Sequence, residues 1–227
     1  GGKRLRPLLA WRCAEAVGGR GEDSVPAGLA VELVHAFSLV HDDLPALDND
    51  DLRRGRPTLH RHAGEAMAIL AGDAMLSMAY EALLHGGTPS LTDATRAALV
   101  RELGEGTRAM IAGQVFDTLG GLPDGLDGRG RLETIHRNKT GGLIRAACRM
   151  GALLGGAAEG SPELDAVGRF ADGLGLVFQI VDDLLDVTAT AEAVGKATGK
   201  DLDAGKLTYP GVLGLDGTRR EIERVQA

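Results

Sequence analysis

Two groups of aspartates set within apolar sequence constrain this chain more than any other feature. The first places five aspartates between residues 42 and 51, directly after the almost wholly apolar segment 29–40. The second is the stretch 182–186, Asp-Asp-Leu-Leu-Asp, which again lies inside apolar sequence. Unpaired carboxylates are costly to remove from water, so both groups need partners if the surrounding segments are buried. An all-oxygen ligand set of this kind suits magnesium, which shares its remaining positions with water and substrate phosphates.

Each group also has a simpler interpretation. An acidic run is often a solvated loop, and the aspartates of residues 182–186 can instead cap a helix or form salt bridges. The metal interpretation is favoured because the chain contains two such groups, and each supplies ligands that match the other.

Composition restricts the class of protein and its partners. The 227 residues are enough for one domain with a substantial core, and the net charge of -7 argues against nucleic acid or an anionic membrane as the main partner. No uninterrupted apolar run reaches the length of a membrane span, and no signal peptide opens the chain. We therefore expect a cytoplasmic protein without stable membrane insertion, in which Cys13 and Cys148 are buried reduced thiols.

Apolar periodicity predicts an all-α chain. Pro45 should end the second helix near Asp43, and Pro162 should begin a later helix with Ser161 as its cap. No stretch alternates well enough to predict a sheet. The predicted helices cover residues 8–17, 25–43, 64–84, 92–119, 132–154 and 162–187, and a last helix starts after residue 210.

Helical spacing groups the polar side chains of two of these segments. In the segment 162–187, one stripe is polar while apolar side chains fill the rest of the helix, and a polar stripe on a buried helix needs partners. The stripe consists of Gln179, Asp182, Asp183 and Asp186. In the segment 132–154, a three- and four-residue spacing places His136, Lys139 and Thr140 on one face.

Basic residues near these groups offer contacts to phosphate. Arg53 and Arg54 directly follow the first aspartates and can grip phosphate bidentately, whereas a lysine acts as a point charge. Each cation alone is more often a solvated surface charge, and a lone histidine such as His35 is more often a satisfied core residue. Together with two magnesium-type groups, they predict a site for phosphate-rich ligands. The other cations in this set are Lys3, Arg6, Lys139, Lys196, Lys200 and Lys206.

Taken in order, these blocks resemble the trans-isoprenyl diphosphate synthases over the whole chain. One aspartate pair is a weak signal, whereas the ordered set is specific. The blocks are residues 1–7, 35–48, 50–55, 139–141, 178–186, 195–196 and 205–210. The resemblance implies an all-α, isoprenoid-synthase-like bundle around a deep central cavity, usually a homodimer. Residues 1–227 are expected to form a single domain of this kind, truncated at both ends.

The resemblance also implies two diphosphate sites. In the allylic site, magnesium is bound by Asp42, Asp48 and Asp182, with Asp43, Asp183 and Asp186 in support. The same site is lined by Arg53, Lys139, Thr140, Gln179, Lys196 and Lys206, of which Lys139 and Lys196 are also expected to act in catalysis. The isopentenyl diphosphate site is formed by Lys3, Arg6, His35 and Arg54.

The implied reaction condenses isopentenyl diphosphate with dimethylallyl or geranyl diphosphate. Metal ions and cations stabilise the departing diphosphate, so that the carbon–oxygen bond ionises. The isopentenyl double bond attacks the allylic cation, a proton is lost, and apolar helix walls exclude water that would quench the cation.

Product length is predicted from the helix that precedes the first aspartates. Phe37 lies five residues before Asp42, which places it about 7 Å deeper along the helix axis. In the resembling family this position helps to end chain growth. A large aromatic there acts as the floor of the product cavity, and Ser38 is too small to add to it. We therefore expect farnesyl diphosphate, with geranylgeranyl diphosphate as the alternative product.

Three other functions stay open at this point. A terpene cyclase shares the fold and the first aspartate motif, but normally carries an Asn/Ser/Glu triad in place of the second. A metal phosphohydrolase would need further histidine ligands in helical register, which the remaining histidines do not supply. A catalytically silent subunit of a heteromeric synthase usually lacks one motif, and both are present here.

Overall fold

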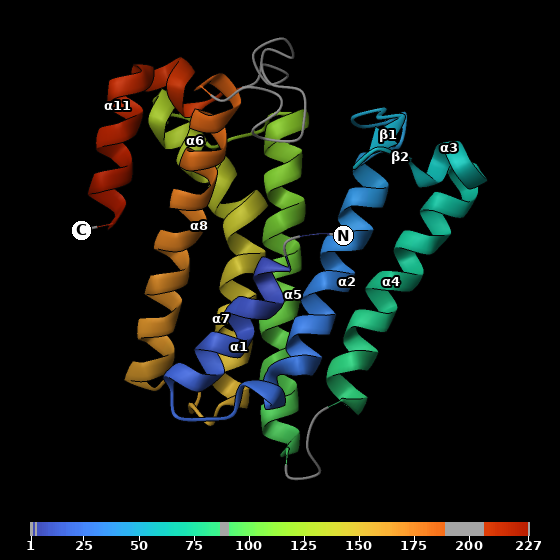
Figure 1. Ribbon diagram of the computed structural model, residues 1–227, viewed down its shortest axis with the longest axis vertical. Helices are drawn as coiled ribbons and strands as arrows, with labels where there is room; N and C mark the ends of the chain where they lie inside the picture. The colour runs from blue at the N-terminus through green and yellow to red at the C-terminus, as the bar shows by residue number, and fades with distance from the viewer. Residues whose placement is uncertain (1, 3, 87–90, 189–206, 227) are drawn as a thin grey trace. The chain divides into compact units, whose positions relative to one another are not determined.

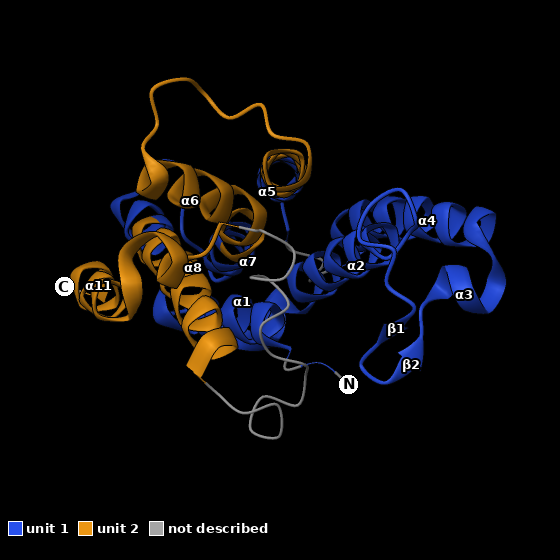
Figure 2. Ribbon diagram, turned by 90° about the horizontal axis from the view of Figure 1, so that it is seen from above, with its two compact units in different colours: residues 1–107, 145–168 blue, residues 108–144, 169–227 orange. Residues whose placement is uncertain are grey.

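The computed structural model describes residues 2, 4–86, 91–188 and 207–226. Within them the chain is helical apart from one short hairpin, which confirms the all-α prediction (Figure 1). The chain divides into two compact units, one of residues 1–107 with 145–168 and the other of residues 108–144 with 169–227 (Figure 2). The single domain expected over the whole chain stays a prediction.

The first unit contains α1 (Leu5–Ala16), a 3-10 turn (Gly21–Ser24), α2 (Val25–Asp42), β1 (Leu52–Arg53), β2 (Arg56–Pro57), α3 (Leu59–Ala63) and α4 (Glu65–His85). The second contains α6 (Gly128–His136), the π-helical turn η2 (Arg137–Gly141) and α11 (Tyr209–Gln226). The boundary between the units falls within α5 (Asp93–Thr118), α7 (Gly142–Leu154) and α8 (Pro162–Thr188).

Helix α2 is the central helix of the first unit and packs against both α1 and α4 (Figure 1). Its close contact with α4 depends on Gly72, where an added Cβ would lie 2.1 Å from Nε2 of His41. The same nitrogen lies 3.1 Å from the carbonyl oxygen of Ile69. The end of α2, which leads into the first aspartates, is therefore held against α4 by a histidine that requires a glycine opposite its ring.

Small residues bring α1 and α7 together within the first unit. An added Cβ at Gly151 would lie 2.1 Å from the carbonyl oxygen of Ala10, so the two backbones approach closely there. Cys13 and Cys148 are buried free thiols, as the sequence predicts. Their mutual hydrogen bond lowers the pKa of Cys13 and raises that of Cys148. This contact fixes α1, whose first turn carries Arg6.

The second unit has an apolar core where α6, α8 and α11 meet. Four fully buried side chains form it, and they are Leu132, Leu176, Ile180 and Tyr209. The partly buried side chains packed against them come from α11, and they are Val212, Leu213, Ile222 and Val225. Burial of Tyr209 anchors the first residue of α11 next to α8.

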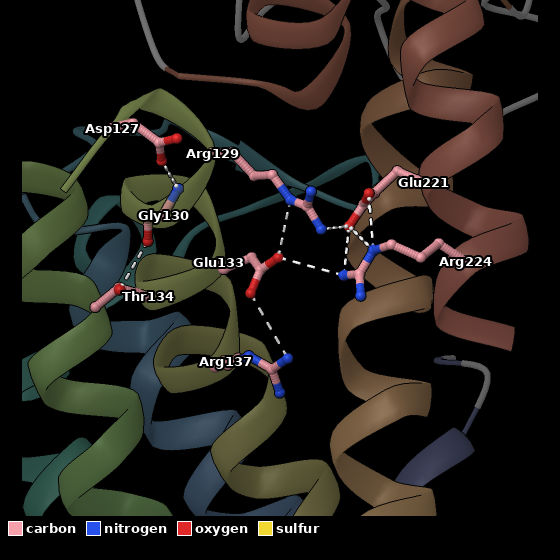
Figure 3. A network of polar contacts seen from close by, with 8 residues as sticks. All are labelled: Asp127, Arg129, Gly130, Glu133, Thr134, Arg137, Glu221 and Arg224. Atoms are coloured by element: carbon pink, nitrogen blue, oxygen red, sulfur yellow. Dashed lines mark hydrogen bonds and ion pairs between the residues drawn. The ribbon is translucent and has the colours of Figure 1, made fainter. Parts of the chain in front are cut away.

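A network of arginine and glutamate side chains also links α6 to α11 (Figure 3). Glu221 is 5% exposed and accepts hydrogen bonds from Nη2 of Arg129 at 2.9 Å and from Nη2 of Arg224 at 2.7 Å. Glu133 accepts from Nε of Arg129 at 3.2 Å and lies 3.7 Å from Nη2 of Arg137. A buried carboxylate needs such partners, so the network stabilises the placement of α11 on α6.

Local sequence signals located several helix ends correctly. Helix α2 ends at Asp42, three residues before Pro45. Helix α8 begins at Pro162, and the hydroxyl of Ser161 accepts from the backbone N–H of Leu164 at 3.2 Å. Both results follow from the restrictions that proline and a capping hydroxyl place on the neighbouring backbone.

Two of the differences between the structure and the sequence prediction involve residues of the predicted site. The predicted helix 132–154 is interrupted by η2, where the wider π-helical turn rotates the side chains that follow it. A hairpin of two-residue strands, with Arg53 opposite Arg56, occupies a segment where no sheet was expected. Strands this short leave no alternating pattern in the sequence.

Two segments of the described chain, Gly21–Asp42 and Glu65–His85, have the length and hydropathy of a membrane span. Core helices of soluble proteins pass the same test. Here the two helices of these segments, α2 and α4, pack against each other.

Candidate active site

The first aspartate motif is built at the C-terminal end of α2. Beyond the helix end, the backbone N–H of Asp48 donates to the carbonyl oxygen of Asp42 at 2.9 Å. The loop therefore returns to the helix and brings residue 48 next to residue 42. Because the last carbonyls of a helix carry partial negative charge, carboxylates collected at this end favour a cation.

Asp43, the second residue of this motif, is paired with an arginine of the hairpin. Its side chain is buried, and Oδ1 accepts from Nε of Arg53 at 2.8 Å and from Nη2 at 2.6 Å. The carboxylate of Asp50 lies 3.9 Å from the same guanidinium. The hydrogen bonds that Arg53 donates to Asp43 raise the pKa of Arg53. Asp43 thus has a protein cation as partner within the motif itself.

The hairpin gives its two neighbouring arginines different surroundings. Arg54 and Gly55 have φ values of 53° and 74°, and a two-residue type I′ turn requires positive φ at both positions. Glycine adopts this conformation freely, whereas for an arginine it costs about 1–2 kcal/mol. Arg53 pairs with Asp43, while Nη1 of Arg54 lies 2.9 Å from the position of an added Cβ on Gly2. The turn separates two cations that the sequence assigns to different diphosphate sites.

His35 lies among three arginines in the first unit. Burial, followed by the charges of Arg6, Arg54 and Arg53, lowers its pKa to about 4, so the imidazole is neutral near pH 7. Burial also lowers the pKa of Arg6, whose Nε is buried and has no hydrogen-bond partner among the described residues. Arg6 and Arg54 are thus near enough to His35 for their charges to lower its pKa, and all three are among the four residues predicted for isopentenyl diphosphate. A concentration of arginine donors of this kind suits an anion.

The second aspartate motif is connected to two other segments of the second unit. Asp183 is buried, and its oxygens accept from Nε2 of Gln179 and from the backbone N–H of Tyr209, both at 2.9 Å. The hydroxyl of Thr140 donates to Oε1 of Gln179 at 3.0 Å. Nε2 of His136 lies 3.8 Å from Asp183, and burial lowers the pKa of His136 to about 4. Thr140 and Gln179, both predicted to line the allylic site, are in contact, whereas no pattern in the sequence indicates the bond from Tyr209.

The π-helical turn η2 presents the predicted catalytic lysine. Nζ of Lys139 donates to Oδ2 of Asp117 on α5 at 2.5 Å. An added Cβ at Gly113 would lie 2.2 Å from the backbone nitrogen of Lys139, and one at Gly175 would lie 2.8 Å from Cα of Gly141. Glycines on two helices therefore allow close approach to the turn. Isolated glycines inside helical segments are the sequence signal that marks such contacts.

The remaining predicted residues differ in what the structure shows of them. Phe37 is 7% exposed, and its ring meets that of His41 edge-on at a centroid distance of 5.6 Å. Ser38 donates from Oγ to the carbonyl oxygen of His35 at 3.0 Å. The lysines of the predicted phosphate site that lie outside the described residues are Lys3, Lys196, Lys200 and Lys206.

The donor chemistry of both motifs fits magnesium. Within the described ranges, no three histidine, cysteine, aspartate or glutamate side chains form a group that could hold a metal by themselves. Magnesium at phosphate-handling sites is bound by one or two carboxylates and completes its coordination with phosphate oxygens and water. Asp42 and Asp48 in the first unit, and Asp182 in the second, are suited to supply such partial ligand sets.

The chain matches the polyprenyl synthetase family over residues 1–227. It belongs to this family. The heterodimeric geranylgeranyl pyrophosphate synthase large subunit 1 of Arabidopsis thaliana is 45% identical over 99% of this chain and 61% of its own length. Geranylgeranyl pyrophosphate synthase 7 of the same plant is 47% identical over 96% of this chain and 62% of its own length. The chain thus spans about three fifths of the length of these relatives.

A solved structure shows the same fold. The geranyltransferase from Helicobacter pylori, complexed with magnesium and isoprenyl diphosphate, is 32% identical with a TM-score of 0.82, covering 100% of this chain and 75% of its own. Together with the family match, this confirms the resemblance inferred from the ordered blocks and the all-α isoprenoid-synthase fold.

Two expectations change with these comparisons. Both plant relatives are named as chloroplastic proteins, which contradicts the predicted cytoplasmic location. Both are also named as geranylgeranyl rather than farnesyl synthases, and one is a subunit of a heterodimer. The features used for location, the lack of a membrane-length apolar run and of a signal peptide in these residues, do not distinguish the cytoplasm from a plastid.

Proposed function

We propose that this polyprenyl synthetase condenses isopentenyl diphosphate with an allylic diphosphate. The observation that carries the proposal is the buried Nε of Arg6, which has no hydrogen-bond partner among the described residues and lies in the same unit as the first aspartate motif. The unit therefore offers carboxylates that favour a metal ion and, separately, cations that bind an anion directly. A reaction between two diphosphates needs both kinds of site.

The allylic diphosphate would be bound by residues of both motifs. Asp42 with Asp48, and Asp182, would hold magnesium, which when bound supplies positive charge to the leaving group. Lys139 and Thr140 would contact the same diphosphate from η2. The allylic carbon–oxygen bond breaks, and its electron pair leaves with the diphosphate that these cations stabilise.

Isopentenyl diphosphate would be bound by the arginines around His35. The buried Nε of Arg6 offers a donor with no partner among the described residues, and Arg54 offers a second guanidinium. A neutral His35 can donate one hydrogen bond without a proton transfer. The isopentenyl double bond then forms the new carbon–carbon bond, and the proton lost from the adduct goes to the released diphosphate.

The product we propose is geranylgeranyl diphosphate, the product in the names of relatives that share 45% and 47% of their aligned residues with this chain. Farnesyl diphosphate is the second candidate, because the buried ring of Phe37 lies five residues before Asp42. Purified protein incubated with magnesium, isopentenyl diphosphate and geranyl diphosphate, with products resolved by length, distinguishes the two. No condensation product with any allylic starter would contradict the proposed function and favour a silent subunit.

Phe37→Ala tests the floor that this aromatic residue would form. If Phe37 ends chain growth, the variant shifts the product distribution by at least one five-carbon unit. Removing a buried phenylalanine also costs about 3–5 kcal/mol of stability, so circular dichroism must first show that the variant is folded. The matched control is Ser38→Ala on the same helix, which should leave product length unchanged. A folded, active Phe37→Ala variant with unchanged products would show that another residue forms the floor.

We also propose that the protein acts as a dimer. Large apolar side chains are exposed along α4, and monomeric proteins rarely expose extensive apolar surface. These side chains are Met67, Ile69, Leu70, Met78 and Leu84. Sedimentation of the purified protein alone tests for a homodimer, and a monomer that associates only with a different synthase subunit would contradict it.

A further inference from the structure

Among the described residues, the carboxylate of Asp183 accepts hydrogen bonds from two donors of the second unit that carry no charge. One oxygen accepts from the side-chain amide of Gln179 and the other accepts from the backbone N–H of Tyr209, each at 2.9 Å. The residue is 4% exposed. An ionised carboxylate only accepts hydrogen bonds, so Asp183 fixes which end of the Gln179 amide faces it.

The orientation of the Gln179 amide in turn determines a contact with the π-helical turn η2. With Nε2 of Gln179 directed at Asp183, Oε1 is directed at Thr140, whose hydroxyl donates to it at 3.0 Å. Thr140 is the residue after Lys139, and the turn that contains both is approached closely by Gly113 and Gly175. The carboxylate therefore determines the position of a side chain in the predicted allylic site without touching it.

The same carboxylate also holds the start of α11. Its acceptance of the Tyr209 N–H satisfies one of the backbone donors that a helix N-terminus leaves unpaired. The Tyr209 ring stacks on His136, the last residue of α6 before η2, with ring centroids 5.6 Å apart and planes 24° apart. One buried aspartate thus joins η2, α8 and the first residue of α11.

We propose that Asp183 is a positioning residue, which orients Gln179 and Thr140 toward the allylic diphosphate and fixes the start of α11, rather than a ligand that the metal requires. The proposal rests on the proposed prenyltransferase function. In this proposal the two neighbouring aspartates of the second motif have different roles. Asp182 would bind the metal, whereas Asp183 binds donors of the protein itself.

The test exchanges the two side chains of the hydrogen bond. Asp183→Asn alone presents an amide to two donors and loses one bond, and Gln179→Glu alone places two carboxylates together. The double variant Q179E/D183N can restore these bonds with the charge moved by one helical turn. Thr140 and the amide introduced at position 183 would then donate to the new carboxylate. The Tyr209 N–H would donate to the carbonyl oxygen of the introduced amide.

We expect Asp183→Asn and Gln179→Glu each to lower kcat/KM for the allylic substrate about tenfold to a hundredfold, as the loss of a charge-assisted bond predicts. The double variant should recover most of that loss, with a half-saturating magnesium concentration within about threefold of the parent protein. A double variant that stays as impaired as Asp183→Asn, with a raised magnesium requirement, would overturn the proposal and make Asp183 a metal ligand. An unimpaired Asp183→Asn variant would overturn it as well.

A second measurement separates this proposal from the proposed function. Amide hydrogen exchange at Tyr209, measured without magnesium or substrate, should be faster in Asp183→Asn and slower again in the double variant. This result does not depend on turnover, so a protein without prenyltransferase activity would defeat the function while the exchange data still test the contact. Unchanged exchange at Tyr209 in Asp183→Asn would contradict the proposal.

The matched control is Asp127→Asn. Asp127 also accepts a backbone N–H at the start of a helix, from Gly130 at 2.7 Å, and belongs to the same unit (Figure 3). Its substitution should lower the melting temperature without altering the magnesium requirement or kcat/KM. A loss of kcat/KM equal to that of Asp183→Asn would mean that any destabilised cap in this unit impairs the site, and would contradict a specific role for Asp183.

Discussion

The second carboxylate of each aspartate motif is enclosed by protein, but the two are enclosed in different ways. Asp43, 3% exposed, accepts three hydrogen bonds from the charged guanidinium of Arg53, ten residues along the chain. Asp183, 4% exposed, accepts from the neutral amide of Gln179 and from the backbone of Tyr209, 26 residues along the chain.

This difference shows that the second aspartate of two similar motifs can stabilise different parts of the fold. The pair of Asp43 and Arg53 closes a short loop and holds a hairpin at the end of its own helix. The bond from Tyr209 to Asp183 joins residues 26 positions apart, for which the entropy cost of loop closure is larger. In both motifs the first aspartate, Asp42 or Asp182, is less buried than the second.

The largest effects are expected from the first aspartate of each motif. Asp42→Ala and Asp182→Ala should each lower kcat by at least about a hundredfold, because each removes a carboxylate that would hold magnesium on the leaving diphosphate. Circular dichroism without metal should first show that each variant is folded. Near-normal turnover of either variant at saturating magnesium would contradict the metal assignment.

Smaller effects, separated by substrate, are expected from the cations. Arg6→Ala should raise the KM for isopentenyl diphosphate, and Lys139→Ala should raise the KM for the allylic diphosphate. Each change should be about tenfold to a hundredfold, the worth of one charge-assisted phosphate contact. Steady-state kinetics with each substrate varied in turn measures the effect of each variant on the two KM values. Equal effects of both variants on both substrates would refute the division into two sites.

The ion pair of Asp43 and Arg53 should contribute measurably to the free energy of unfolding. Asp43→Ala leaves a partly buried guanidinium without its partner and should lower the free energy of unfolding by about 1–3 kcal/mol. Arg53→Met added to that variant should recover part of the loss, as a double-mutant cycle in urea can show. The control is Asp51→Ala, whose pair with Arg61 has side chains 64% and 52% exposed and should contribute less than about 1 kcal/mol. Equal losses for the two aspartates would show that burial of Asp43 is energetically unimportant.

The last effect concerns pH and His35, whose pKa the neighbouring arginines lower. The folded-state pKa of His35 is lowered to about 4, below its usual value of 6.5. As pH falls from 6.5 to about 4, the unfolded chain binds a proton at His35 that the folded chain does not bind. The free energy of unfolding therefore decreases as the solution becomes more acidic. The slope contributed by His35 is at most about 1.4 kcal/mol per pH unit. His35→Asn should flatten the stability profile between pH 6.5 and 4, whereas His62→Asn, at an exposed position, should not.

Much of the helical architecture is determined locally and could therefore be predicted. Pro45 ends α2 near Asp42, and Pro162 with Ser161 begins α8, because each acts on the backbone of its immediate neighbours. The candidate site residues could be named for a related reason. They occur in short blocks in which the needed residue types stand side by side, as Arg53 and Arg54 do.

What depends on tertiary structure is the partner of each side chain. The bond from Tyr209 to Asp183 and the pair of Lys139 with Asp117 join residues on different helices. The π-helical turn at Lys139 has no periodic signature of its own and is approached by Gly113 and Gly175 from two other helices. Spacing along one helix reports only that helix, whereas these contacts arise when several helices pack. Sequence could therefore identify both aspartate motifs, but only the packed chain assigns Asp43 and Asp183 their partners.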